Sequence, residues 1–344
     1  MEKVTLSGGR TIGAGSPCFV VAEIGSNHNR SLTLAKELID AAAECGADAA
    51  KFQIYSADTL YSKYTPPHSG YKKNLHTLIS EIETPREWLE ELASRCAEKG
   101  LVFFATPFDK NAVDQLNPYS ELFKVASFEL TDLPLIERVA SKRKPVIIST
   151  GLAAMDEISD ALRTCRAAGN RQVVLLQCAS LYPALPGAMN LRAMKTMRDA
   201  FGAPVGLSDH TAGTQVSVAA VALGACVVEK HFTLSRTMEG PDHPFAMEPD
   251  EMKLLVSMIR DVEAALGDGL KRGPREEERE NFTIRRSVHA TRDIAAGSAI
   301  TEDMLCIKRP GLGIAPKHII DLPGKKTVRD IAADEWLTWD MLLP

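Results

Sequence analysis

The segment CFVVAEIGSNHNRSLTLAKELIDAAAECGADAAKFQI, residues 18–54, contains one complete strand–helix–strand pattern. Its two ends, residues 18–24 and 49–54, are almost continuous apolar runs, which is typical of parallel strands buried on both faces. Between these runs, apolar residues recur at helical spacing and form a single stripe: Leu34, Leu38, Ile39, Ala42 and Ala43. The segment therefore predicts two buried parallel strands joined by an amphipathic helix.

The same pattern recurs until about residue 266. Six further apolar runs are candidate strands: residues 101–106, 122–126, 145–150, 173–178, 204–207 and 226–230. Eight strand–helix units in about 250 residues predict a TIM (β/α)8 barrel. A doubly wound open sheet is the alternative, but no G-x-G-x-x-G motif follows the first strand. We therefore expect an α/β barrel over residues 1–266.

The pattern breaks at GDGLKRGPREEERE, which begins at residue 267. Its glycines, proline and dense mixed charge predict a linker over residues 267–281. Residues 282–344 carry short apolar runs separated by Gly- and Pro-containing turns, so they predict a small β-rich domain. We expect Trp336 and Trp339 to fill the core of that domain.

Composition excludes several classes of protein. The 344 residues include 40 Lys+Arg and 45 Asp+Glu, a net charge of −5, so neither a nucleic acid nor an anionic membrane surface is an expected partner. No apolar run approaches the roughly 20 residues of a membrane span. The seven cysteines form no C-x-x-C pair and predict neither a disulfide framework nor a zinc ribbon. We expect a cytoplasmic protein, because no apolar signal-peptide core follows Met1.

Polar residues follow every predicted strand, at the end of a TIM barrel where active sites lie. Two of them, Lys51 and Lys124, supply positive charge, and three hydroxyls supply neutral donors: Ser127, Ser149 and Ser208. This combination predicts a site for phosphate, or for phosphate and carboxylate together. The alternative is that each lysine pairs with a local carboxylate, Glu23 or Glu129, for structural reasons.

Two histidines, His210 and His231, end the last two predicted strands. Neighbouring barrel strands lie about 5 Å apart, so the two imidazoles can share one divalent ion such as Mn²⁺, Co²⁺ or Zn²⁺. The alternative assigns acid–base chemistry to one histidine and core packing to the other. His28 and His243 are weaker metal candidates. Cys178, near the same end of the barrel, is expected to pack rather than to react.

The chain resembles the sialic acid synthase family over essentially its full length. That family comprises N-acetylneuraminate, pseudaminate and legionaminate synthases and a spore-coat polysaccharide enzyme. The motifs that carry the resemblance are AEIG at 22–25, KFQ at 51–53, TPF at 106–108, KVASFE at 124–129, YP at 182–183, GLSDH at 206–210, EKHF at 229–232, GPDH at 240–243 and KRPG at 308–311.

The resemblance implies a reaction: phosphoenolpyruvate (PEP) condenses with an N-acylated hexose and gives phosphate and a nine-carbon 2-keto acid. It implies that PEP is held by Lys51, Lys124, Ser127, Ser149, Ser180 and Ser208. It implies that the sugar faces Glu23, Gln53, Thr106, Tyr182, Glu229 and Asp242. It implies that Glu23, Glu129, Lys51 and Lys124 are the catalytic residues, with either glutamate able to donate or accept the proton. His210 and His231 would bind the metal, with Mn²⁺ expected and Co²⁺, Mg²⁺ or Zn²⁺ as alternatives.

The resemblance also implies that the C-terminal domain is an antifreeze-like (SAF) domain. In the family this domain crosses to the partner's active site in a domain-swapped homodimer, so Arg309 would reach the sugar's N-acyl group in the partner. The expected sugar is N-acetylmannosamine or a relative. A bis-acetamido 6-deoxyhexose, the pseudaminate- or legionaminate-type acceptor, is the alternative. Ser180, where sialate synthases often have Asn, and the form of the segment 126–129 leave that choice open.

Two further readings compete with this one. Another PEP-dependent synthase could make a seven- or eight-carbon keto acid from a sugar phosphate, but we find one lysine–hydroxyl cluster rather than two. A non-catalytic protein could bind ice or carbohydrate through its C-terminal domain. The charged residues Lys308, Arg309, Lys325 and Lys326 do not suit the flat uncharged surface that ice binding needs.

Overall fold

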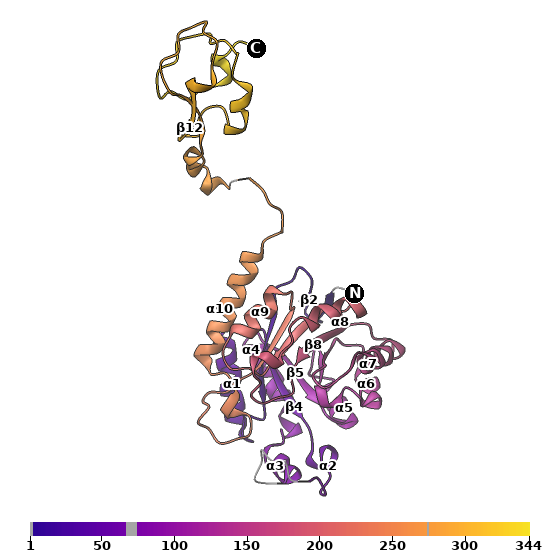
Figure 1. Ribbon diagram of the computed structural model, residues 1–344. Helices are drawn as coiled ribbons and strands as arrows, with labels where there is room; N and C mark the ends of the chain where they lie inside the picture. The colour runs from indigo at the N-terminus through magenta and orange to yellow at the C-terminus, as the bar shows by residue number, and fades with distance from the viewer. Residues whose placement is uncertain (1–2, 67–73, 274) are drawn as a thin grey trace. The chain divides into compact units, whose positions relative to one another are not determined.

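The computed structural model describes residues 3–66, 74–273 and 275–344. The chain divides into two compact units, Met1–Gly267 and Asp268–Pro344 (Figure 1). Each unit has its own hydrophobic core. The described helices include none that is long and apolar enough to cross a bilayer.

The first unit is a closed barrel of eight parallel strands, so the predicted fold is confirmed and the open sheet is excluded. The strands are β3 (Phe19–Gly25), β4 (Ala49–Ile54), β5 (Val102–Pro107), β6 (Phe123–Val125), β7 (Val146–Ser149), β8 (Val173–Cys178), β9 (Val205–Asp209) and β10 (Val227–His231). Each predicted strand overlaps one of these. The barrel closes where β10 pairs with β3, with Val227 opposite Phe19 and His231 opposite Glu23.

Helices follow the strands and surround them in Figure 1. They are α1 (Leu32–Glu44), α4 (Leu89–Glu98), α5 (Lys110–Leu116), α6 (Leu133–Ala140), α7 (Met155–Ala167), α8 (Ala193–Phe201), α9 (Gln215–Ala222) and α10 (Pro249–Leu266). Two short helices, α2 (Ala57–Leu60) and α3 (Leu75–Ile82), lie between β4 and α4. Side-chain caps start several helices: the Ser31 hydroxyl accepts the backbone N–H of Leu34 at 3.2 Å.

An N-terminal hairpin, which the sequence analysis missed, packs with the barrel interior. Its strands are β1 (Lys3–Thr5) and β2 (Thr11–Gly13), and Val4, Leu6 and Ile12 share one apolar cluster with residues of the barrel strands. Asp48, at the start of β4, accepts the Val20 N–H at 2.7 Å and forms ion pairs with Arg260 and Arg10. These contacts tie the hairpin and α10 to the amino end of the barrel.

The second unit is β-rich and small, as predicted. Strands β11 (Ser287–Ala290) and β12 (Leu305–Lys308) pair antiparallel, and short 3₁₀ turns and isolated bridges supply much of the remaining structure. The prediction for its tryptophans is wrong, because Trp336 is 37% and Trp339 50% exposed. Smaller side chains fill the core instead: Val288, Ala290, Ile294, Ile300, Leu305, Ile314, Leu322, Ile331, Leu337, Met341 and Leu342.

Candidate active site

One cavity at the carboxyl ends of the barrel strands gathers most of the predicted site residues. Side chains alternate along each strand, so the residues that face this cavity come from different strands. Its lining is Glu23, Lys51, Gln53, Thr106, Lys124, Ala126, Ser127, Phe128, Ser149, Cys178, Tyr182, Ser208, His210, Glu229 and His231. The cavity therefore combines ammonium, carboxylate, hydroxyl and imidazole groups in one place.

The two lysines are buried and share a carboxylate. The Lys51 Nζ lies 2.7 Å from Glu23 and 3.6 Å from Glu229, and the Lys124 Nζ lies 3.8 Å from Glu229. Burial alone would lower the pKa of Lys51, but Glu229 and Glu23 outweigh it and raise that pKa. Burial raises the pKa of Glu229, but the two lysines together lower it by more. Glu229 therefore stays ionised. Lys51 does pair with Glu23, as the structural alternative predicts, yet it still faces the cavity.

Hydroxyl groups surround the lysines. Lys124 donates to the Ser149 hydroxyl at 2.7 Å, Lys51 lies 3.4 Å from the Thr106 hydroxyl, and Ser208 donates to Glu229 at 3.2 Å. Burial lowers the pKa of Lys124, against the opposing effect of Glu229. The arrangement can hold an anion with two cations and several neutral donors.

Gly151 closes one wall of this region. Its backbone N–H donates to the Ser127 hydroxyl at 3.0 Å. A Cβ added to Gly151 would lie 2.6 Å from both the Cys178 sulfur and the Ser180 hydroxyl, and 3.0 Å from the Ser127 hydroxyl. The Ser180 hydroxyl is buried and has no hydrogen-bond partner within the described chain. The hydroxyls of two predicted PEP ligands, Ser127 and Ser180, therefore both lie next to Gly151.

We expect Gly151→Ala to weaken PEP binding by about tenfold or more, because the added methyl displaces both hydroxyls; a tenfold loss is about 1.4 kcal/mol. Isothermal titration with PEP measures the effect. Gly187→Ala is the matched control, since no atom lies within 4 Å of its added Cβ. Equal PEP affinity in the two variants would contradict the placement of Ser127 and Ser180 around the ligand.

His210 and His231 lie together, with ring centroids 5.5 Å apart. The His210 Nδ1 donates to the Ala179 carbonyl at 2.8 Å, which leaves its Nε2 as the acceptor nitrogen. The His231 Nδ1 is buried without a hydrogen-bond partner and lies 3.8 Å from Asp242. Burial lowers the pKa of both histidines, and His210 and Lys51 lower that of His231 further. Both rings are therefore neutral, the form that binds metals.

These two histidines fit a divalent metal ion. A buried imidazole nitrogen without a partner is costly unless something binds it, and Nδ1 of His231 is such an atom. The described residues contain no cluster of three or more His, Cys, Asp or Glu side chains with metal-binding geometry. The protein would thus supply two nitrogen ligands and leave other positions to water or substrate, as open catalytic sites do.

Two carboxyl groups near the cavity are strongly perturbed. Burial raises the pKa of Glu129 to about 7, against a smaller opposing effect of Lys124. Burial and the neighbouring Glu23 raise the pKa of Asp242 to about 7. Carboxyl groups that titrate near neutral pH are candidates for acid–base chemistry. Glu23 differs because Lys51 pairs with it and Gln53 donates to it at 2.7 Å, although its burial also raises its pKa.

Glu129→Gln should become more stable relative to the wild type as pH rises. The unfolded chain deprotonates Glu129 near its ordinary pKa of 4.5, whereas the folded state does so near 7. Between these values the folded state binds more protons, so wild-type stability falls with increasing pH and the neutral Gln avoids that loss. We expect the difference in unfolding free energy to grow by about 2–3 kcal/mol between pH 5 and pH 8.

Urea denaturation at several pH values measures this difference. Glu277→Gln, at an exposed position of the predicted linker, is the control and should give a flat difference. A flat difference for Glu129→Gln as well would mean that Glu129 is not held in the buried environment described.

Not every predicted residue lines the cavity. Ser180 lies behind Gly151, Asp242 lies beside His231, and Glu129 lies in the short turn after β6. Arg309 belongs to the second unit, whose position relative to the barrel is not determined. Two weaker metal candidates point elsewhere: His28 bonds Thr84 and the Arg30 backbone, and His243 bonds Thr233.

Three side chains at the site were not predicted as participants. Phe128 lines the cavity, and Cys178, expected only to pack, also lines it, 3.0 Å from the Ser127 hydroxyl. Burial raises the pKa of Cys178, so it remains a thiol and not a nucleophile. Phe245 packs against His231 and Tyr182 at ring-centroid distances of 5.0 and 5.4 Å. No sequence signal marks Phe245, because it lies in a single-turn 3₁₀ helix, His243–Phe245, well beyond β10.

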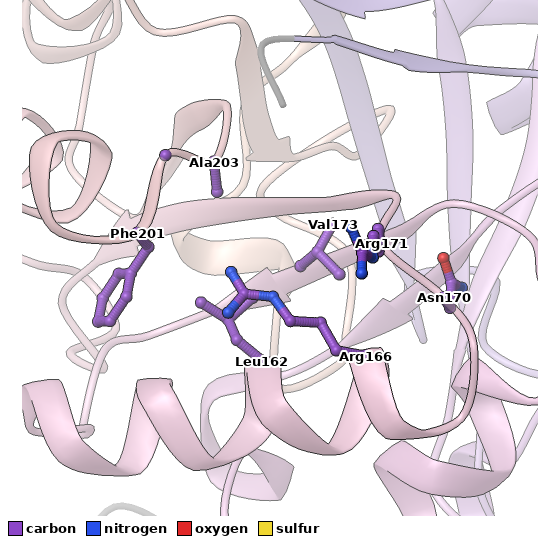
Figure 2. A pocket seen from close by; sticks show the side chains of 8 residues that line it. Leu162, Arg166, Asn170, Arg171, Val173, Phe201 and Ala203 are labelled. Carbon is purple, nitrogen blue, oxygen red and sulfur yellow. The ribbon is translucent and has the colours of Figure 1, made fainter.

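A second pocket, shown in Figure 2, is not a competing active site. It lies beside the C-terminal ends of α7 and α8 and the amino end of β8, away from the strand ends that carry the lysines and histidines. Figure 2 shows Arg166 extending from α7 over Leu162. The pocket has no carboxylate, imidazole or lysine among its eight lining residues, so it lacks the groups for acid–base chemistry.

Fold and site together define a TIM-barrel protein with a charged, histidine-containing mouth and a separate small β-rich domain. The chain belongs to the NeuB family: the model of that family matches residues 38–271, and the model of the SAF domain matches residues 285–343. The resemblance found in the sequence motifs is thereby confirmed.

Several similar proteins are synthases of legionaminic, pseudaminic or N-acetylneuraminic acid. The chain is 40% identical to the N,N'-diacetyllegionaminic acid synthase of Legionella pneumophila, over 97% of each chain. It is 38% identical to the pseudaminic acid synthase of Helicobacter pylori, over 94% of this chain and 97% of the other. The crystal structure of N-acetylneuraminic acid synthetase from Leptospira borgpetersenii matches 81% of this chain and 95% of its own, with TM-score 0.74 and 33% identity.

Proposed function

We propose that this protein is a PEP-dependent synthase of a nonulosonic acid. Carbon 3 of PEP attacks the aldehyde carbon of an open-chain N-acylated hexose and forms the new C–C bond. Water adds to the cationic carbon 2, and the resulting tetrahedral intermediate releases phosphate by C–O cleavage. The product is a nine-carbon 2-keto acid. The observation that carries the proposal is the buried pair Lys51 and Lys124, beside three serine hydroxyls and two imidazoles, in one barrel cavity.

Each group has a task in this reaction. Lys51 and Lys124 offset the charge of the PEP phosphate and carboxylate throughout, and the hydroxyls of Ser127, Ser149, Ser180 and Ser208 orient them. Glu129, with a pKa of about 7, is the better candidate to transfer a proton, because Glu23 is bound to Lys51. Gln53, Thr106, Tyr182 and Asp242 would face the sugar.

His210 and His231 would hold a divalent metal, with Mn²⁺ expected. When bound, such an ion polarises a carbonyl oxygen as a Lewis acid. The Ala179 carbonyl fixes which nitrogen of His210 is free, and the Tyr182 ring, 4.2 Å from the His210 ring, shields it.

Glu229 was expected to face the sugar, and its surroundings suggest a different task. It lies within 4 Å of both lysines and accepts from Ser208, which are all proposed PEP ligands. We therefore propose that Glu229 orients the two ammonium groups while the anion binds. Its Oε2 atom has no hydrogen-bond partner in the described chain and can accept from a ligand or water.

The proposed acceptor is N-acetylmannosamine or a related N-acylated hexose, with a bis-acetamido 6-deoxyhexose as the alternative. Phosphate release from PEP in the presence of Mn²⁺ tests both the reaction and the acceptor. Turnover only with N-acetylmannosamine identifies a sialate synthase. Turnover only with the bis-acetamido 6-deoxy-altrose makes Ser180 and residues 126–129 markers of the acceptor. Bound PEP without turnover on either sugar would contradict both acceptors, and absence of PEP binding would reject the function.

We also propose a homodimer in which the SAF domain covers the partner's barrel. Large apolar side chains stand exposed on the loops around the cavity, among them Phe128 at 59%, Leu152 at 62% and Leu185 at 76%. These side chains are the candidates for the surface that the partner's SAF domain would cover. The seven free cysteines, six of them buried, support a reducing compartment such as the cytoplasm.

Arg309→Ala should raise KM for the acylated sugar about tenfold or more and leave PEP and metal binding within twofold. Arg309 is exposed and forms no ion pair within the described residues, so its guanidinium is available to a substrate amide. Steady-state kinetics with separate PEP and Mn²⁺ titrations measure the split. Arg292→Ala, which removes a surface ion pair with Asp303 in the same domain, is the control. Loss of PEP binding in Arg309→Ala would mean that the proposed position of the SAF domain at the sugar site is wrong.

A further inference from the structure

A buried ion pair lies on the outer face of the two strands that carry the histidines. Side chains alternate along a strand, so Ser208 and Glu229 face the cavity while Asp209 and Lys230 face away from it. Asp209 and Lys230 are direct partners in the register of β9 and β10. They are 1% and 4% exposed, and the Lys230 Nζ lies 3.0 Å from the Asp209 Oδ2.

The pair is connected to both sides of His210. Asp209 directly precedes His210, and Thr211 directly follows it. The Asp209 Oδ1 accepts hydrogen bonds from the Thr211 backbone N–H and from the Thr211 hydroxyl, both at 2.8 Å. Lys230 donates to the Thr211 carbonyl as well. The Asp209 Oδ2 also accepts the Ser217 hydroxyl from α9 at 2.6 Å. Lys230 itself directly precedes His231, so one network holds the backbone next to both histidines.

We propose that Asp209 and Lys230 are positioning residues that set the separation of His210 and His231 and thereby the affinity for the metal. This inference rests on the metal site of the proposed function. Neither side chain contacts the cavity, so neither is a ligand.

Energetics favour this role over a purely stabilising one. Taking two charges out of water is expensive, and an apolar pair of similar size often gives equal or greater stability. The network has five directed contacts, including the ion pair itself, and these contacts add a defined geometry. Two imidazoles that must share one ion require such a geometry, and groups behind metal ligands typically change metal affinity 10–100-fold when they are removed.

Direct titration of the full-length protein with Mn²⁺, without substrates, tests the inference. We expect Asp209→Asn and Lys230→Met to weaken Mn²⁺ binding about 10–100-fold and to change PEP affinity less than threefold. Ser217→Ala is a milder variant that removes one contact from outside the two strands, so it tests the network if the others do not fold. It should weaken Mn²⁺ binding a few-fold.

Two further variants separate positioning from stability. Asp48→Asn removes another buried, ion-paired carboxylate at the amino end of the barrel. It should lower the unfolding midpoint and leave Mn²⁺ affinity unchanged. The double variant Asp209→Leu with Lys230→Met should recover stability relative to the single variants but not Mn²⁺ affinity.

The outcomes are distinguishable. Normal Mn²⁺ affinity in folded Asp209→Asn, Lys230→Met and Ser217→Ala would overturn the inference and leave the proposed function intact. Equal weakening in Asp48→Asn would also overturn it, because the effect would then follow stability. Absence of Mn²⁺ binding by the wild type would remove the metal from the proposed function and the inference with it.

Discussion

Lys124→Met is expected to lower kcat/KM for PEP by about 10³-fold while the barrel remains folded. Lys124 is buried, donates to Ser149 and lies opposite the ionised Glu229. Methionine keeps much of the volume but removes the charge, so the phosphate would meet Glu229 with only Lys51 to offset it. Because the lost interaction acts on a charge that persists through the reaction, the loss should appear mainly as weaker PEP binding and a higher KM, with a smaller fall in kcat.

Initial rates and PEP titrations measure the two parts of this effect. Lys142→Met is the control, since Lys142 pairs with Asp114 on the outside of the barrel. Lys124→Glu should be worse than Lys124→Met, because it places a second negative charge beside Glu229. Unchanged PEP affinity in Lys124→Glu would refute the anion site.

The barrel could be predicted because its signal is local. A strand buried on both faces must be apolar along most of its length, and a helix packed on it must carry an apolar stripe, so both periods are visible in the sequence. The same logic located the lysines and histidines, since buried polar residues at the ends of such strands are costly unless a partner or a ligand satisfies them. The hairpin of β1 and β2 was missed because its strands have three residues each.

Interactions that depend on distance could not be predicted. Sequence placed Glu229 at the barrel mouth but not between two lysines, and it placed Asp209 beside His210 without indicating that Lys230 pairs with it. The tryptophans of the SAF domain show a related limit. Their size suggested a core position, but a small domain whose core is filled by aliphatic residues leaves them at its surface.

In the proposed dimer, part of the contacts to the acceptor sugar would come from the partner chain. Apart from Ser127 and Ser180, the residues around the anion site belong to barrel strands, so their positions follow from the fold. The groups proposed for the sugar lie on loops, apart from Glu23, Gln53 and Thr106, and one of them, Arg309, would come from a partner. Under the proposed function, small loop differences, such as Ser180 at the position behind Gly151, would decide between acceptors that share a PEP site.

His231→Ala is expected to abolish turnover and to destabilise the metal-free protein only through the lost packing of its ring on Phe245 and Tyr182. The His231 Nδ1 is buried without a hydrogen-bond partner. The substitution therefore loses no hydrogen bond at this nitrogen and removes an unsatisfied polar group. His210→Ala also loses ring packing, and in addition it loses the bond to the Ala179 carbonyl, so it should cost about 1 kcal/mol more. Both variants should reduce turnover by about 10³-fold or more, since each removes one of two ligands.

Thermal unfolding with and without Mn²⁺ distinguishes a ligand from a packing residue. A metal that binds only the folded state stabilises it by about 2.7 kcal/mol at 100 times its dissociation constant. The wild type should show that stabilisation and lose it in excess chelator without unfolding, because the site is preformed. His231→Ala should show none, while His243→Ala, whose imidazole bonds Thr233 outside the cavity, should retain it. Full Mn²⁺ stabilisation of His231→Ala, or full activity in chelator, would assign His231 to packing and leave the reaction without its metal.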